Sequence, residues 1–82
     1  MTEVLPSAVI VRLRDGSRAY VHSQDRGDDG EVVAIHGTDY DGQPIIWQRT
    51  GHFYKGIRKS PRDIMQRFDS NLGQWIRKFP IP

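Results

Sequence analysis

A chain of 82 residues has room for one small domain, which buries only about 60–65% of its unfolded surface and so has a thin core. The absence of cysteine excludes disulfides and thiolate metal sites, and no apolar run approaches the roughly 20 residues of a membrane span. With 37% hydrophobic and 27% charged residues and no leader-like N-terminus, the sequence predicts a polar globular protein of the cytoplasm.

The net charge of +2 conceals an uneven distribution. Residues 1–43 contain four Arg and eight Asp or Glu, a net of −4, whereas residues 44–82 contain eight Lys or Arg and two Asp, a net of +6. Such asymmetry indicates an anionic partner if the halves form separate faces. The alternative is that the halves interleave in space and their charges largely cancel.

The first part of the chain has the pattern of short strands. Residues 1–7 contain Pro6 and predict a loose lead-in, and residues 8–13 alternate as in a half-buried strand. Asp15-Gly16 predicts a hairpin turn of type I′ before a strand at 18–22. An acidic surface loop at 23–30 precedes strands at 31–36, 44–49 and 52–55, the last two joined by Thr50-Gly51. We therefore expect a four- or five-stranded antiparallel meander.

The C-terminal part predicts one amphipathic helix over 61–79. Ser60 can cap it, Pro61 suits its first position, and Asp63 suits its first turn. Apolar residues then recur at spacings of three and four, namely Ile64, Met65, Phe68, Leu72, Trp75, Ile76 and Phe79. Poor helix formers leave a break near 69–73 open. The expected fold is α+β, a single domain over 1–82 with the helix packed on the sheet and with Trp47 and Trp75 near the centre of their interface.

Motifs for catalysis are missing from the sequence. No serine lies in a nucleophile elbow, and there is no glycine-rich nucleotide loop. His22, His36 and His52 lack the spacing of metal ligands and are expected at solvated strand ends. We expect a protein that is not an enzyme and that holds no metal or cofactor.

Basic residues between the fourth strand and the helix form the main candidate site. They are Arg49, Lys55, Arg58, Lys59 and Arg62. Together with the rings of His52, Phe53 and Tyr54, which can stack on unpaired bases, they are typical of a nucleic-acid contact surface. The alternative is that these cations only solubilise the protein and that the aromatic residues belong to the core.

The acidic loops favour a different partner. They would repel a duplex unless they face away from it, and charged loops of this kind steer and specify protein interfaces. A host protein or ribonucleoprotein is therefore the first expected partner, and direct DNA or RNA binding is the alternative. A free sheet edge also makes homodimerisation plausible, and no membrane contact is expected.

The run D-x-D-G-x-P-I-x-W-x-x-x-G-x-x-x-x-G from Asp39 to Gly56, followed by S-P-x-D-I from Ser60 to Ile64, resembles small β-sheet proteins of bacteriophages and prophages. The resemblance covers residues 8–65 and does not include the predicted helix beyond Gln66. It implies an accessory protein of a mobile element, active in a bacterial cytoplasm. Such proteins include inhibitors of host defence systems, such as anti-CRISPR proteins, which bind and occlude their targets.

Overall fold

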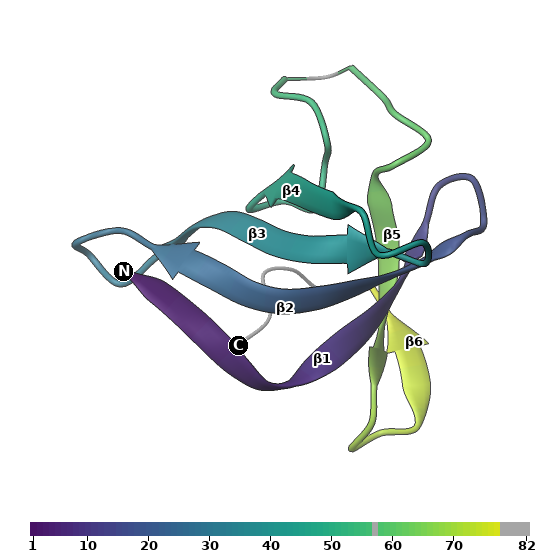
Figure 1. Ribbon diagram of the computed structural model, residues 1–82, viewed down its shortest axis with the longest axis horizontal. Coiled ribbons are helices and arrows are strands. Elements are labelled where there is room, and N and C mark those ends of the chain that lie inside the picture. The colour runs from purple at the N-terminus through teal and green to yellow at the C-terminus, as the bar shows by residue number, and fades with distance from the viewer. Residues whose placement is uncertain (57, 78–82) are drawn as a thin grey trace.

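A computed structural model describes residues 1–56 and 58–77, and these form one antiparallel sheet (Figure 1). Its strands are β1 (Thr2–Leu13), β2 (Arg18–Arg26), β3 (Val32–Asp39), β4 (Pro44–Gln48), β5 (Ile64–Asp69) and β6 (Gln74–Ile76). Their order across the sheet is β4-β3-β2-β1-β5-β6. The first four strands form the expected meander, and β5 then returns to pair with the opposite edge of β1.

The sheet is strongly bent, so that β5 and β6 run across the direction of β3 and β4 (Figure 1). Buried apolar side chains from five strands fill the inside of this bend: Val11, Leu13, Ala19, Val21, Val32, Ile35, Ile45, Trp47 and Ile64. Trp47 joins the two ends of the sheet, because its indole Nε1 donates a hydrogen bond of 2.7 Å to the backbone oxygen of Arg62, just before β5. The sequence-based assignment of Trp47 to the core is confirmed.

The bend also depends on one close approach between strands. Gly37 lies opposite Val21 on β2 and Ile45 on β4. A Cβ atom at this position would collide with the backbone oxygen of Tyr20 and would lie 2.9 Å from the Trp47 ring. Only glycine lets the Trp47 ring lie this close to β2 and β3.

The prediction of a C-terminal helix was wrong. Residues 64–69 and 74–76 are strands, and Asp69 closes the turn between them by accepting hydrogen bonds from the backbone N–H groups of Asn71 and Leu72. The signals at Ser60 and Pro61 belong to a β-turn, in which the Asp63 N–H donates to the Ser60 oxygen at 3.0 Å. Serine and proline favour the first two positions of a β-turn as well as a helix start, so the local chemistry did not separate the two.

The apolar residues of the expected helix stripe lie in different environments in the structure. Ile64 is buried as predicted, but Leu72 is 61% exposed in the β5–β6 turn. Trp75 packs edge-to-face on Phe68 and lies 4.3 Å below the Arg12 guanidinium, away from the buried core cluster. Phe79 lies outside the described residues.

Three other boundaries also differ from the prediction. The lead-in 1–7 is mostly strand: Thr2 pairs with Asp25, and the ladder is interrupted only between Val4 and Val9, around Pro6, which has no N–H to donate. The acidic loop is shorter than expected because residues 23–26 belong to β2. Residues 53–55 form bends and His52 is in no strand, so the predicted fifth strand at 52–55 is wrong.

The Asp15-Gly16 turn is confirmed in position but not in type. Gly16 N–H donates to the Leu13 oxygen, and Leu13 N–H donates to the Ser17 oxygen, which makes a three-residue loop. Positive φ occurs at Gly16 and not at Asp15, as in a type I turn followed by a glycine bulge. Pro44 begins β4, as predicted for a residue that cannot donate to the ladder.

Candidate functional site

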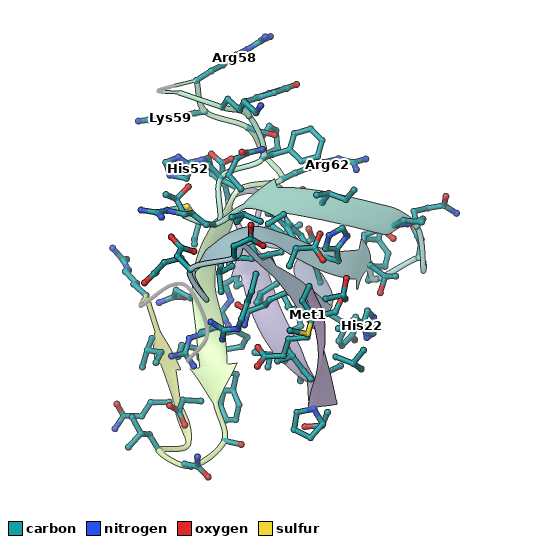
Figure 2. The ribbon with its side chains drawn as sticks, turned by 90° about the vertical axis from the view of Figure 1, so that its left-hand side faces the viewer. Met1, His22, His52, Arg58, Lys59 and Arg62 are labelled. Atoms are coloured by element: carbon teal, nitrogen blue, oxygen red, sulfur yellow. The ribbon has the colours of Figure 1, made fainter. Side chains whose placement is uncertain are left out.

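A long connection leaves the sheet between β4 and β5, and we call residues 49–62 the basic excursion. It projects beyond the strands, with Arg58 and Lys59 at its far end (Figure 2). The five residues predicted to bind a partner, Arg49, Lys55, Arg58, Lys59 and Arg62, all lie on it, and all are exposed. The structure therefore brings the predicted residues onto one projecting segment.

These five side chains form no ion pair with any residue that the structure describes. The salt bridges among the described residues are Arg14–Asp63, Arg26–Glu3, His36–Asp25 and Arg67–Asp69. No described carboxylate lies within 4.0 Å of a cation of the basic excursion. The positive charge of the excursion is thus left for solvent or a partner.

The base of the excursion is held by one buried carboxylate. Asp63 is fully buried, and its Oδ1 accepts a hydrogen bond from the backbone N–H of Phe53 at 2.8 Å. Its Oδ2 accepts from the Ser60 N–H at 3.0 Å and from the Arg14 guanidinium at 3.0 and 3.2 Å. One side chain therefore ties both ends of the excursion to the β1–β2 turn.

The pKa of Asp63 records this arrangement. Burial raises the pKa, but hydrogen bonds from Phe53 and Ser60 and the charge of Arg14 more than offset it, so the pKa lies below its ordinary value of 3.8. The carboxylate is therefore charged at neutral pH, when it holds the excursion most firmly. This role of Asp63 could not be predicted from the sequence, because an aspartate at this position suits the first turn of a helix equally well.

Two further hydrogen bonds fix the point where the excursion rejoins the sheet. The Arg62 backbone N–H donates to Ser60 Oγ at 3.1 Å, and the Arg62 backbone oxygen accepts from Trp47. The backbone of Arg62 is thus anchored while its side chain remains exposed.

Aromatic rings and arginines stack on one another within the excursion. Phe53 and Tyr54 pack edge-to-face with ring centroids 5.1 Å apart. The guanidinium of Arg58 lies 4.5 Å from the Tyr54 centroid, and that of Arg62 lies 5.7 Å from the Phe53 centroid. Stacking was predicted for His52, Phe53 and Tyr54. Phe53 packs against the core, whereas His52 and Tyr54 are exposed, so only these two remain candidates for stacking.

A groove of about 570 Å³ opens beside the excursion. It lies where the excursion leaves the end of β4, next to the start of β3. Its walls are Val33, Gln48, Arg49, Thr50, His52, Tyr54, Lys55 and Gly56. Arg49 and Lys55 line this groove, whereas Arg58 and Lys59 lie at the far end of the excursion. Four of the predicted residues therefore form two pairs, one in the groove and one at the tip of the excursion.

Arg62 differs from the other four cations. It lines a separate hollow of about 200 Å³ with Asp15, Asp39 and Asp41. The pKa of Asp15 is lowered, chiefly by hydrogen bonds from Ser17 and in smaller part by the charge of Arg62. These carboxylates weaken the attraction of Arg62 for an anionic partner, so the groove and tip form the stronger part of the site.

The acidic turn at 27–31 lies away from the excursion. It joins β2 and β3 at one end of the sheet, while the excursion rises from a different side (Figure 1). Asp28, Asp29 and Glu31 are exposed there. The acidic and basic residues are therefore only partly separated in space, since Asp15, Asp39 and Asp41 line the same hollow as Arg62.

Each histidine has different neighbours. His36 Nε2 lies 2.6 Å from Asp25 Oδ2, His22 contacts Thr38 at 2.9 Å, and His52 lines the groove. The pKa of Asp25 is lowered by hydrogen bonds from Thr2 and His36. Among residues 1–56 and 58–77, no group of three His, Cys, Asp or Glu side chains is placed to hold a metal ion.

A second cation cluster on the sheet was missed from the sequence. Arg12 and Arg18 face each other across β1 and β2, and both lie near the Trp75 ring, at 4.3 and 5.9 Å. Arg67, expected on a solvated helix face, is instead buried. The helix assumption hid both features, because it assigned Trp75 to the core and Arg67 to solvent.

Comparisons with protein-family models, with curated proteins and with solved structures find no match to this chain. The described part of the chain also contains no helix long and apolar enough to cross a membrane.

Proposed function

We propose that the chain is a non-enzymatic binding protein whose basic excursion contacts nucleic acid, either free or as the exposed RNA of a ribonucleoprotein. The observation that carries the proposal is the set of exposed cations on one anchored segment, none of which has a carboxylate of residues 1–56 or 58–77 within 4.0 Å. Unpaired Lys and Arg beside an exposed ring are the usual means of binding phosphates and unstacked bases.

The anchoring of the excursion supports a binding role. A flexible loop loses conformational entropy when it binds, whereas a segment held at its base by Asp63 and Trp47 loses less. Because the tip projects beyond the sheet, it can enter a groove of a larger partner (Figure 2). Such a contact would occlude the partner's own ligand, as expected of a mobile-element inhibitor.

A second candidate is a host protein whose surface carries an acidic region and a basic region. The acidic region would contact the excursion, and the basic region would contact the exposed Asp28, Asp29 and Glu31 at another end of the sheet, which nucleic acid would not use.

Capture from a bacterial lysate separates the two candidates. The tagged protein is compared with Lys55→Glu/Lys59→Glu and with the control Arg18→Glu/Arg77→Glu, which removes the same amount of charge elsewhere. We expect RNA, or a ribonucleoprotein, to be retained by the wild type and the control, and lost from the excursion variant and after nuclease treatment.

Two other outcomes would change the proposal. A stoichiometric protein that survives nuclease treatment but is lost from the excursion variant would replace the main proposal with the second candidate. Equal capture by all three proteins would remove the excursion from both.

A further inference from the structure

The groove beside the excursion has the size and lining of a site for one nucleotide. Its volume of about 570 Å³ lies within the range of small-ligand sites, far below what a duplex would need. It lies between Val33 at the start of β3, Gln48 at the end of β4 and the first part of the excursion. One side of the groove is therefore sheet, and the other is the anchored excursion.

The charge of the groove fits an anion. Arg49 and Lys55 line it, and none of its lining residues is Asp or Glu. Neither cation has a carboxylate of the described chain within 4.0 Å. A phosphate placed between them would gain two charge-assisted contacts without breaking an ion pair.

The same groove also offers apolar surface. Val33 is 54% exposed and Tyr54 is 37% exposed, although both line the groove. The Tyr54 ring is already positioned by Phe53 at 5.1 Å and by Arg58 at 4.5 Å. A base that stacks on this ring would therefore meet a side chain whose orientation is set in advance.

We propose that this groove seats one nucleotide of a single-stranded nucleic acid, with the base against Tyr54 and Val33 and the adjoining phosphate between Arg49 and Lys55. The inference rests on the proposed nucleic-acid contact and adds to it an unpaired base as the recognised group. A duplex would offer its phosphates but keep its bases stacked, so the site discriminates in favour of single strands.

The test uses two strands of equal charge. One is a fluorescent oligothymidylate of about ten nucleotides, and the other is an abasic strand of the same length, so that only the bases differ. Binding of the full chain, of Tyr54→Ala and of Tyr54→Phe is measured by fluorescence anisotropy at low salt. Circular dichroism melting of each variant checks that the fold is retained.

The wild type is expected to bind oligothymidylate about tenfold more tightly than the abasic strand. Tyr54→Ala should remove this difference, and Tyr54→Phe should preserve it. Equal affinity of the wild type for the two strands would overturn the nucleotide seat but leave the phosphate contact of the excursion intact. Failure of the wild type to bind either strand would instead overturn the nucleic-acid function itself.

Discussion

At the scale of single residues, Asp63 is the side chain on which the candidate site depends most. It satisfies two backbone N–H groups of the excursion and pairs with Arg14 while fully buried. Buried donors that lose their acceptor cost about 1–3 kcal/mol each, so its removal affects both fold and site. Neighbouring Asp15 also has a lowered pKa but is exposed, which makes it a suitable control.

Replacement of Asp63 by Asn should lower the free energy of unfolding by about 2–4 kcal/mol at pH 7, because the amide lacks the charge and places an N–H group against donors. The folded-state pKa of Asp63 is depressed, so its contribution is complete above the ordinary value of 3.8 and is lost as the pH falls through the folded pKa. The stability difference between wild type and Asp63→Asn should therefore shrink below about pH 4. Urea unfolding from pH 7 to pH 2.5 measures it.

Asp15→Asn should cost less at every pH in the same experiment, since its hydrogen bonds to Ser17 are exposed to water. A difference for Asp63→Asn that stayed constant or grew in acid would contradict the assigned role of its charge.

At the scale of elements, the sequence predicted the sheet better than the segment after it. Alternation and turn residues predicted β1 to β4 in the right order, because period-two patterns and glycine turns are local signals, but they missed the first part of β1 and the last part of β2. The prediction failed after residue 60, because Ile64, Phe68, Leu72 and Trp75 have the spacings of three and four that are typical of a helix. Two short strands joined by a turn can show the same spacings when their apolar residues lie in different environments. Only long-range pairing with β1, seen at Val11 and Arg67, decides between the two.

The candidate site shows the same limit. The predicted cations are all exposed on the excursion. Their exposure could be predicted because charge and glycine content are properties of the sequence itself. The groove, the stacking of Arg58 on Tyr54 and the anchor at Asp63 were not visible, since each joins residues brought together by the turns.

Leucine 72 distinguishes the strand hairpin from the predicted helix directly. In the helix it would face the core, but in the structure it is 61% exposed in a turn. We expect Leu72→Ser to change the free energy of unfolding by no more than about 0.5 kcal/mol. Ile64→Ala, at a buried position in β5, should cost about 2–5 kcal/mol.

Chemical denaturation of both variants under identical conditions provides the comparison. If Leu72→Ser were as destabilising as Ile64→Ala, Leu72 would have to be buried, and the β5–β6 hairpin would be contradicted.

At the scale of the whole molecule, the bent sheet acts as a support for a charged projection. The core enclosed by β1 to β5 fixes Trp47, and Trp47 and Asp63 fix the excursion. The tip cations Arg58 and Lys59 project away from the strands (Figure 2). The excess of basic residues in the second half of the sequence thus forms one exposed basic segment, the excursion.

The salt dependence of binding to single-stranded RNA tests this account most directly. Release of counterions gives a slope of about −0.7 per phosphate contacted in a plot of log affinity against log salt. Contacts from three to five excursion cations predict a wild-type slope of about −2 to −3.5, reduced in magnitude by about 1.4 in Lys55→Glu/Lys59→Glu. The control Arg18→Glu/Arg77→Glu should keep the wild-type slope, whereas equal slopes for the two variants, or no binding at low salt, would contradict the account.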